Sequence, residues 1–362
     1  MSLQDWGWDS YFEAVWSSER CENARPARVV SQHRGLWRIA GDLPDGWAEP
    51  SGKLRLDAAS GSDWPAVGDW VAISRESAEG RAQVQAVLPR RSSFSRKEPG
   101  RRVGEQVIAA NVDTAFIVCA LDGDFNPRRI ERYLTQCWDS RVKPALLLNK
   151  ADLCADLPEK LRAAEQIAIG CSILVASAQT GEGIREIREG LLPRRTYALL
   201  GSSGVGKSTL LNRLLGEAVQ PTQPTRESDS RGRHTTTSRE LFPLPGGALL
   251  IDTPGLRELQ LWTTGKQAIS EAFPEIETLA ARCRFRDCRH EGEPGCAVAA
   301  AMKAGALDPR RLESRRKLLR EEAFLQRKIN PGLQQAEKHR FKVISRQIRE
   351  RYRHGEKDPR SG

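Results

Sequence analysis

The stretch YALLGSSGVGKSTLLNRLL, Tyr197 to Leu215, decides how the middle of this 362-residue chain folds. An apolar run leads into a glycine-rich turn, and a run with helical periodicity follows. The turn fits the pattern G-x-x-x-x-G-K-[ST], with Gly201, Gly206, Lys207 and Ser208 at its fixed positions. Glycines let backbone N–H groups approach phosphates, and the N-terminus of the following helix favours their negative charge. We therefore predict a strand, a phosphate-binding loop and a helix.

Two residues of this loop have predicted chemical roles, and the whole loop is predicted to bind the nucleotide. Lys207 reaches the β and γ oxygens of the nucleotide and takes a catalytic role, whereas the Ser208 hydroxyl ligates magnesium. The competing interpretation is a plain glycine-rich turn, which the flanking strand and helix patterns disfavour. The nucleotide-binding residues predicted in the loop are Gly201, Ser202, Ser203, Gly204, Val205, Gly206, Lys207, Ser208 and Thr209.

Two segments downstream of the loop fit the same chemistry. In ALLIDTPGL, a strand ends at Asp252, which places a carboxylate near the magnesium shell, and Gly255 follows with an N–H near the γ-phosphate. The polar segment GRHTTTSRE precedes that strand, where a mobile switch segment needs a threonine that contacts magnesium. Thr235 or Thr236 could supply it, and we favour Thr236, which we also predict to be catalytic.

A guanine-reading pair of motifs lies upstream of the loop. LLLNKADL supplies Asn149, Lys150 and Asp152 after an apolar strand. The Asp152 carboxylate can accept hydrogen bonds from guanine N1–H and its 2-amino group together, a donor pair that adenine does not present. VASAQTGEGI adds Ser177 and Ala178, where a backbone N–H can bond guanine O6. These motifs predict that the nucleotide is GTP.

The order of these motifs is unusual. Small GTPases carry the phosphate loop first and the guanine-reading motifs last, whereas here NKAD and SA precede GSSGVGKST. We interpret this order as a circular permutation, which is physically tolerable because domain termini lie at the surface and often near each other. The alternative is a P-loop kinase or ATPase with a fortuitous NKAD, and competition between ATP and GTP would separate the two.

The net charge of +10 is concentrated in the C-terminal tail. Residues 310–362 contain 17 Lys or Arg against 7 Asp or Glu, an excess equal to that of the whole chain. This segment holds enough Leu, Ile and Phe to form helices, broken near NPG. Concentrated positive charge is typical of contact with a nucleic-acid backbone, although a solvated helical face is the plainer alternative.

The remaining patterns suggest four regions. Short alternating runs in ARVVSQHRGLWRIAG, GKLRLDAA, VGDWVAISRE and RAQVQAVLPR predict a small β-barrel of about five strands. Strands then alternate with amphipathic helices, which predicts a parallel sheet with helices on both faces. We divide the chain into a leader at 1–24, a barrel at 25–98, a permuted GTPase domain at 99–265 and a metal-binding domain with a basic tail at 266–362.

A cysteine cluster marks the last region. Cys283, Cys288, His290 and Cys296 have the spacing Cys-x4-Cys-x-His-x5-Cys. Three thiolates and one imidazole make a closed tetrahedral set, which predicts one structural zinc ion per chain. The alternative is a reduced thiol cluster without a metal. The other five cysteines are scattered and are expected to be ordinary buried thiols.

Taken in this order, the motifs resemble the bacterial ribosome small subunit-dependent GTPase A family from about Arg28 to Tyr352. The quoted segments NKAD, SAQTGEGI, GSSGVGKST, GRHTTT and DTPG and the cysteine spacing carry the resemblance. It implies an OB-fold N-terminal domain, binding to the 30S subunit and its 16S rRNA during late maturation, and GTP hydrolysis stimulated by that subunit. The tryptophan-rich leader is the part that this resemblance explains least.

Several partner and location predictions complete the interpretation. GTP and GDP bind with magnesium, the protein acts as a monomer, and no membrane is involved. No apolar run approaches the roughly 18 to 20 residues of a membrane span, and the N-terminus lacks the basic and apolar segments of a signal peptide. We therefore expect a cytoplasmic protein. A non-enzymatic RNA-binding module in which GTP is only structural is the rival from another class.

The sequence lacks the usual group that orients the attacking water. Many small GTPases place a glutamine after the D-x-x-G glycine to orient water, but this chain has Leu256, which can neither donate nor accept a hydrogen bond. Unaided turnover should therefore be slow. His234, beside the switch threonines, is the nearest substitute as a catalytic residue. Its alternative is a histidine that only packs within its loop.

Overall fold

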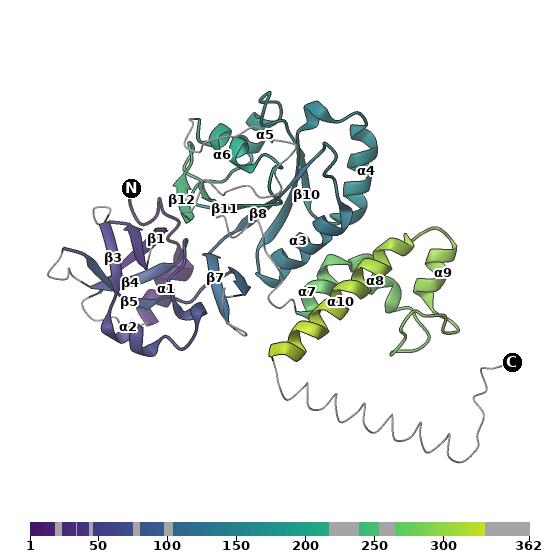
Figure 1. Cartoon of the computed structure of the whole chain (residues 1–362), viewed down its shortest axis with the longest axis horizontal. Helices are drawn as coiled ribbons and strands as arrows, with labels where there is room; N and C mark the ends of the chain where they lie inside the picture. Colours follow the sequence, from purple (N-terminus) through teal and green to yellow (C-terminus); the bar gives the residue numbers. More distant parts are fainter. Residues whose placement is uncertain are drawn as a thin grey trace, which may run out of the picture.

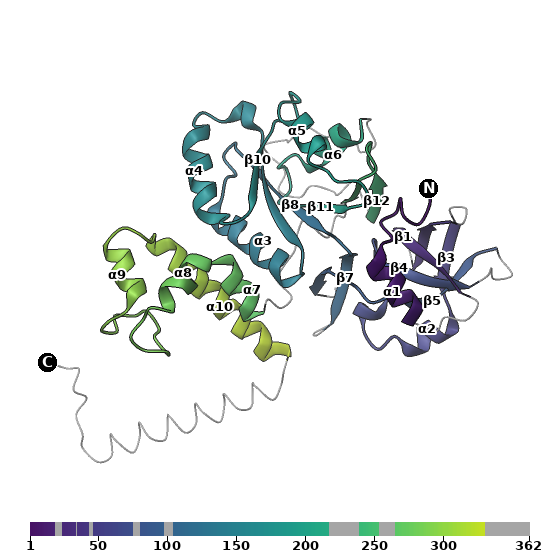
Figure 2. The same ribbon diagram turned by 180° about the vertical axis from the view of Figure 1, so that it is seen from behind.

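The computed structural model describes residues 1–18, 24–33, 35–42, 46–74, 80–97, 104–216, 239–252 and 265–329. Three parts can be followed in Figure 1: a β-barrel in purple, an α/β unit in teal, and a group of helices in yellow-green. The reverse view keeps the α/β unit between the other two (Figure 2). His234, Thr235, Thr236, Gly255 and Leu256 lie outside the described residues, as does the chain beyond residue 329.

The barrel has five strands. β1 pairs with β2 and with β4, and β3 pairs with β5 in parallel, so the order β1-β2-β3-β5-β4 closes on itself. This closed five-stranded arrangement is OB-like, as predicted. Its interior is apolar and includes Val29, Trp37, Val71 and Val84. The strands span β1 Arg25–His33, β2 Leu36–Ala40, β3 Gly46–Pro50, β4 Trp70–Ser74 and β5 Ala82–Val87.

One barrel strand was predicted in the wrong place. The run GKLRLDAA forms a short helix, α2 (Gly52–Asp57), rather than a strand. The Ser51 hydroxyl accepts a hydrogen bond from the Leu54 N–H at 3.1 Å and caps this helix, and a cap of this kind favours helix over extended chain. Leu56 is 88% exposed, so the alternation of apolar residues does not reflect a buried face. The third strand is instead β3, whose flanking Gly and Pro hide a strand pattern.

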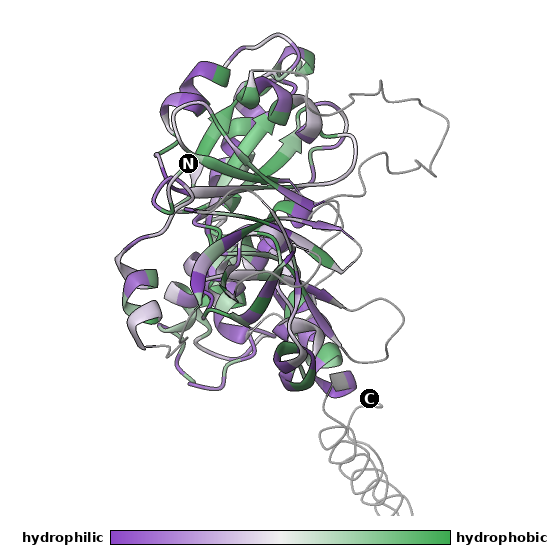
Figure 3. Cartoon of the chain, turned by 90° about the vertical axis from the view of Figure 1, so that its left-hand side faces the viewer, coloured by the Kyte–Doolittle hydropathy of each residue, from purple (hydrophilic) through white to green (hydrophobic). Residues whose placement is uncertain are grey.

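The α/β unit is a parallel sheet with one antiparallel strand. Its order is β10-β9-β8-β11-β13-β12, and only β12 runs against its neighbour. Apolar residues concentrate in the strands of this sheet (Figure 3). The strands span β8 Thr114–Ala120, β9 Lys143–Asn149, β10 Ser172–Val175, β11 Thr196–Leu200, β12 Arg239–Pro243 and β13 Leu249–Asp252.

Helices cover both faces of this sheet, as the sequence predicts. Along β8, Ile117 packs with the helices α3 and α4, whereas Phe116 and Val118 pack with α5 and α6. This alternation follows from the two-residue repeat of a strand. The elements are α3 Pro127–Asp139, α4 Leu157–Ile167, α5 Ile184–Glu189 and α6 Lys207–Leu215, with short 3₁₀ turns at Gly61–Asp63 and Ala151–Leu153.

The barrel and the α/β unit share one continuous sheet. Barrel strand β1 pairs with β12, with Ser31 opposite Glu240 and Gln32 opposite Arg239, and this pairing yields eleven connected strands. A separate two-stranded sheet follows the barrel, made of β6 (Ser93–Lys97) and β7 (Glu105–Ala110). β6 falls within the range assigned to the barrel from sequence, yet it pairs with β7 outside the barrel.

The N-terminal leader packs onto the barrel. Its helix α1 (Ser10–Ser18) presents Phe12, and the preceding turn presents Trp8, to the buried indole of Trp70. The ring centroids lie 4.8 Å apart for Trp8 and Trp70 and 5.8 Å apart for Phe12 and Trp70. Aromatic rings bury a large apolar area in such contacts. The leader is therefore part of the core.

The C-terminal helices lie against α3 (Figure 1). They comprise α7 Lys266–Ala272, α8 Pro274–Ala280, α9 Ala297–Lys303 and α10 Pro309–Ile329, which fits the predicted change to helical structure. None of the helices in the described ranges has the length and hydropathy that a membrane span requires.

Candidate functional site: a nucleotide edge and a cysteine-histidine cluster

The predicted nucleotide residues meet at one edge of the α/β sheet. Lys150 follows β9, Ser177 follows β10, Gly201 follows β11, and Asp252 ends β13. Because the carboxyl ends of parallel strands share an edge, segments far apart in sequence come together there. The structure thus brings both halves of the permuted motif set to a single site.

The phosphate loop wraps around the start of helix α6. Gly204 and Gly206 have backbone φ angles of +83° and +93°, which residues with a Cβ atom rarely adopt. A Cβ at Gly206 would also collide with the side-chain amide of Asn149. The buried ammonium of Lys207 donates to the Gly201 carbonyl at 2.7 Å and to the Ser202 carbonyl. The lysine therefore lies within the loop itself.

Asn149 braces two loops of the site. Its Nδ2 donates to the Val205 carbonyl at 2.8 Å, and its Oδ1 accepts from the Ala178 N–H at 3.0 Å. The side chain is buried, so these bonds form away from water. Asn149 ties the phosphate loop to the segment predicted to contact guanine O6.

Lys150 and Asp152 occupy different surroundings. Lys150 has a φ of +62° and its Nζ lies 2.6 Å from the Asp122 carboxylate. Burial alone would raise the pKa of Asp122, but the hydrogen bonds from Lys150 and the Asp124 N–H, together with the charge of Lys150, outweigh it, and the pKa falls below its usual value. Asp152 is exposed at the rim, whereas Ser177 is buried and its hydroxyl accepts from the Thr180 N–H at 3.1 Å.

Three residues that were not predicted from sequence adjoin this edge. Asp122 lies two residues after the end of β8, and Asp124 and Arg129 follow it in the chain. The Arg129 Nη1 donates to the Ser202 hydroxyl at 2.6 Å, and the guanidinium forms two bonds to the Asp124 carboxylate. The hydrogen bond to Asp124 raises the pKa of Arg129. Their position after a parallel strand beside β11 was the available signal in the sequence.

The site offers oxygen ligands of the kind that magnesium prefers. Asp252 is buried at the end of β13, and β13 pairs with β11, the strand that leads into the phosphate loop. Ser208 is the second residue of α6. Carboxylate and hydroxyl oxygens suit magnesium together with nucleotide phosphates. Two further predicted participants, Thr236 and Gly255, lie outside the described residues.

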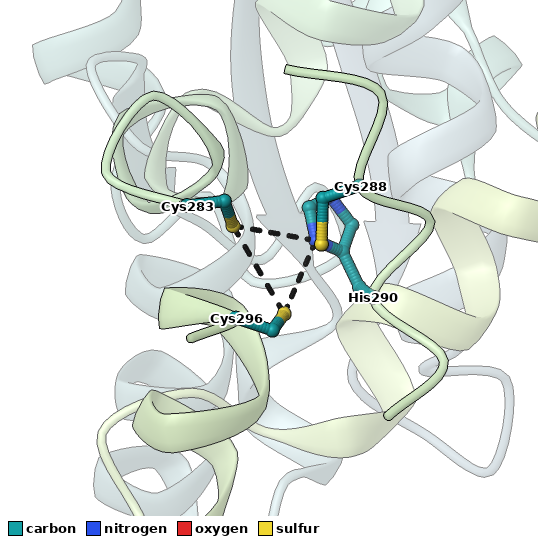
Figure 4. A group of neighbouring side chains, drawn as sticks. All are labelled: Cys283, Cys288, His290 and Cys296. Atoms are coloured by element: carbon teal, nitrogen blue, oxygen red, sulfur yellow. Dashed lines mark hydrogen bonds between the residues drawn. The ribbon is translucent and has the colours of Figure 1, made fainter. Parts of the chain in front are cut away.

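The second predicted site is assembled in the C-terminal helices. The Sγ and ring-nitrogen atoms of Cys283, Cys288, His290 and Cys296 all lie within 4.8 Å of one another. Figure 4 shows the four side chains converging from the ends of α8 and α9 and the loop between them. The His290 Nδ1 lies 3.4 Å from the Cys296 Sγ and 3.7 Å from the Cys283 Sγ. This donor set fits zinc.

The surroundings of His290 favour metal ligation. Burial, and then the positive charge of Arg315, lowers the pKa of its imidazole below the usual value. Neutral imidazole is the form that binds a metal ion. The Cys296 Sγ also accepts a hydrogen bond from the Ala299 N–H at 3.3 Å and so caps helix α9.

A basic cavity of about 630 Å³ adjoins the cluster, between the ligand loop and α10. Two glutamates and the exposed ring of Phe285 share its lining with the cations. Arg316 donates to the carbonyl of His290 at 2.9 Å, so α10 is tied to the ligand loop. The arginines that line the cavity are Arg286, Arg289, Arg315, Arg316 and Arg320. Sequence analysis noted the charge of this region but not the cavity.

An aromatic residue lies on the outer face of the barrel. Trp47 on β3 is 43% exposed, and it lies directly opposite the exposed Arg38 on β2. Side chains at paired positions share one face of a sheet. An exposed indole beside a guanidinium is a suitable platform for stacking a nucleic-acid base.

Comparison with known proteins gives a consistent result. A family model described as RsgA GTPase matches residues 87–262. The chain is 46% identical to "Small ribosomal subunit biogenesis GTPase RsgA" of Opitutus terrae, over 98% of each chain. It is 43% identical to the protein of the same name in Syntrophotalea carbinolica, over 98% of this chain and 100% of the relative.

Solved structures agree. YjeQ from Thermotoga maritima superposes with a TM-score of 0.62 at 27% identity, covering 83% of this chain and 99% of that one. YloQ, described as a circularly permuted GTPase, superposes with a TM-score of 0.60 at 21% identity, covering 84% and 97%. The latter identity supports the fold alone, and the fold it supports is the permuted one.

Proposed function

Because this chain belongs to the RsgA GTPase family, we propose that it binds the 30S ribosomal subunit late in its maturation and hydrolyses GTP with stimulation by that subunit. The family match makes the chain a GTP hydrolase. Curated relatives that align over nearly its whole length are named for biogenesis of the small ribosomal subunit. The observation that carries the proposal is the assembly of the permuted GTPase motifs at one sheet edge, between two parts with nucleic-acid-binding character.

The nucleotide residues are proposed from position and chemistry. Asp152 recognises guanine, and the loop from Gly201 to Thr209 binds the phosphates. Asn149 fixes the phosphate loop relative to the guanine-binding segment through its bonds to Val205 and Ala178. Ser208, Asp252 and Thr236 complete the magnesium shell, and Lys150, Ser177, Ala178 and Gly255 complete the nucleotide set. Magnesium neutralises phosphate charge when the nucleotide is bound.

Two surfaces support an RNA partner. The arginine-lined cavity beside the cysteine cluster offers guanidinium groups and an aromatic ring, which suit phosphates and unstacked bases. Trp47 and Arg38 offer a second platform on the barrel. One zinc ion held by the four cluster residues would stabilise the loop that forms the arginine-lined cavity. We propose that the protein acts as a monomer in the cytoplasm, where the 30S subunit is assembled on 16S rRNA.

The decisive experiment measures GTP turnover by the protein alone and with 30S, 50S or 70S particles. We expect slow turnover alone, because Leu256 cannot orient water, and a large increase only with 30S particles. Nucleotide binding without stimulated turnover would favour the non-enzymatic assembly module. Equal stimulation by 50S particles would contradict the assignment of the small subunit.

The same assay tests the catalytic proposal. We propose that His234 positions the attacking water when the subunit is bound. His234→Ala should keep GTP and 30S binding and lose most of the stimulated rate, whereas Leu256→Ala should leave the chemistry largely intact. Full stimulated turnover in His234→Ala would assign the water-positioning group to the ribosome.

Base choice is tested separately. Asp152→Asn replaces a carboxylate with an amide that can also donate, so GTP affinity should fall and affinity for xanthosine triphosphate should rise. Competition binding with ATP, GTP and xanthosine triphosphate measures both changes. Unchanged GTP binding in the variant would remove Asp152 from guanine recognition and revive the ATPase alternative.

Salt dependence tests the basic C-terminal tail. Each neutralised phosphate adds to the slope of log affinity against log salt. Because α10 packs against the body of the protein through buried Leu312 and Leu318, the informative truncation begins after Ile329. The truncated protein should bind 30S particles with a shallower slope, and equal slopes would mean that the tail charge is only solvated surface.

A further inference from the structure

Helix α3 begins beside the phosphate loop with a closed network of three side chains. The Asp124 carboxylate accepts two bonds from the Arg129 guanidinium, at 2.9 and 2.8 Å. Arg129 in turn donates to the Ser202 hydroxyl at 2.6 Å, and this hydroxyl donates to Asp124 at 2.9 Å. Each member fixes the other two, and a two-pronged Arg–carboxylate pair has a defined orientation.

This network reaches the part of the loop that holds the P-loop lysine. The carbonyl of Ser202 accepts a hydrogen bond from the Lys207 ammonium, so a shift of Ser202 moves the groups that face the phosphates. A loop held in its binding geometry before the nucleotide arrives loses less conformational freedom on binding. Arg129 and Asp124 are therefore placed to set nucleotide affinity without any contact to the base.

The same helix is anchored on its other side to the C-terminal helices. Glu131 accepts from Arg311 of α10 at 2.7 Å, and both side chains are buried, at 4% and 8% exposed. Arg311 also bonds Glu275 at 2.8 Å and lies over the ring of Phe273, 4.4 Å from its centroid. The pair thus joins α3 to α8 and α10.

The geometry of a helix explains how one element serves both contacts. At 3.6 residues per turn, Arg129 and Glu131 project about 200° apart, to opposite sides of the helix. Arg129 faces the phosphate loop and Glu131 faces Arg311. Both lie within the first two turns, so a movement of α10 that carries Glu131 also carries Arg129.

We propose that Arg129 is a positioning residue of the phosphate loop, and that helix α3 couples the nucleotide affinity of this loop to the docking of the C-terminal helices. A partner that displaces those helices would thereby change nucleotide affinity, and nucleotide would change partner affinity by the same factor. The inference rests on the GTPase identity of the chain. It requires neither a ribosomal partner nor a catalytic role for His234, so its failure is distinct from theirs.

The first test measures the dissociation constants of fluorescent GDP and GTP analogues for single and double variants. Arg129→Met should weaken both roughly 10-fold, the loss expected for a hydrogen bond to a charged group that is half-buried. Ser202→Ala should weaken them less, and adding it to Arg129→Met should cost nothing more, because the contact is already lost. Arg129→Lys should recover part of the affinity.

The result that overturns the positioning role is additivity. If the Ser202 and Arg129 losses simply add, the two residues act independently. A loss confined to GDP bound with aluminium fluoride, with GDP affinity unchanged, would instead make Arg129 a group that contacts transition-state charge.

The second test addresses coupling through α3. Glu131→Gln removes the charge that holds Arg311 and should weaken GDP binding several-fold, while hydrogen exchange of the α10 amides rises. The matched control is Arg128→Ala, which removes an exposed ion pair with Glu313 between the same two helices and should leave GDP affinity unchanged. Should Glu131→Gln be too unstable to purify, Arg311→Lys tests the same contact.

Faster exchange in α10 with unaltered GDP affinity would overturn the coupling. Unchanged exchange with unaltered affinity would do so as well, because Glu131 would then hold nothing that the loop senses. An equal loss of affinity in Arg128→Ala and Glu131→Gln would show a general charge effect in place of a specific route.

Discussion

The barrel and the C-terminal helices are joined to the GTPase unit in different ways. The barrel continues the central sheet, because β1 pairs with β12 through backbone hydrogen bonds. The C-terminal helices are held by side chains: buried Arg311 contacts Glu131, and apolar residues of α7 and α10 share one core with α3. A backbone ladder resists separation along its length, whereas side-chain contacts can open locally while the helices they join keep their own backbone hydrogen bonds.

A buried cation strengthens the attachment of the barrel to the GTPase unit, called the barrel junction below. Arg28 of β1 donates to the carbonyls of Trp6, Gly68 and Asn111 and, at 2.9 Å, to the Thr196 hydroxyl. Burial lowers its pKa to about 10, so it stays charged near neutral pH. One side chain thereby connects the leader, the barrel and the start of β11, the strand that leads into the phosphate loop.

This difference in attachment suggests which part of the protein changes position when the bound nucleotide changes. The barrel should move with the GTPase sheet as one body, and its pairing partner β12 directly follows the segment that carries His234 and Thr236. We expect the C-terminal helices to undock more readily than the barrel, and α3 contacts both these helices and the phosphate loop. Four variants test this contrast, in order of decreasing expected effect.

Loss of metal should have the largest effect and be confined to one side of the comparison. Cys288→Ala, or chelation of the wild-type protein, should unfold the region around α8 and α9, because a site of this kind supplies folding free energy directly. The GTPase unit should still bind GTP, with an affinity lowered by no more than the several-fold expected for Glu131→Gln, and the barrel should still unfold together with the GTPase unit. Elemental analysis and hydrogen exchange measure the two halves, and a metal-free protein with a folded C-terminal region would refute the zinc assignment.

Arg28→Met tests the barrel junction. It removes the donor to three carbonyls and one hydroxyl in a buried site, so unfolding of the barrel with the GTPase unit should lose about 3–5 kcal/mol. Denaturant unfolding measures the change. Arg25→Met, at an exposed position of the same strand, is the matched control and should change stability by less than about 0.5 kcal/mol. Equal effects of the two would remove Arg28 as the centre of the junction.

The two junctions also mark what could be predicted from sequence. The phosphate loop, NKAD and the cysteine cluster are local patterns whose spacing carries their chemistry, and the permuted order followed from the first two. The barrel was predicted separately, from short alternating apolar runs. The four bonds of Arg28 join segments up to 168 residues apart in sequence, and the β1–β12 pairing joins Gln32 to Arg239, 207 residues apart. No local pattern encodes either contact. Arg129 was missed for the same reason, since its partner Ser202 lies 73 residues away.

Arg311→Met tests the C-terminal junction. It leaves the buried Glu131 without its cation, which costs about 3–5 kcal/mol where the site cannot relax. If the helices undock, the carboxylate regains water, so we expect a loss of about 3 kcal/mol, limited to the C-terminal helices. Exchange of α10 amides should rise, while the barrel strands stay protected. Equal loss of protection in both parts would contradict their independence.

The exposed pair of Arg128 and Glu313 should have the smallest effect. Its atoms approach to 2.9 Å, but the two side chains are 51% and 63% exposed. Water and salt screen such a pair, so a double-mutant cycle with Arg128→Ala and Glu313→Ala should give a coupling of about 0–1 kcal/mol. The coupling should disappear in 1 M salt, whereas the loss in Arg311→Met should persist because its pair is buried. A salt-resistant coupling near about 2 kcal/mol would show that the contact is desolvated in solution. The C-terminal helices would then be held along their whole length on α3, and the contrast with the barrel junction would weaken.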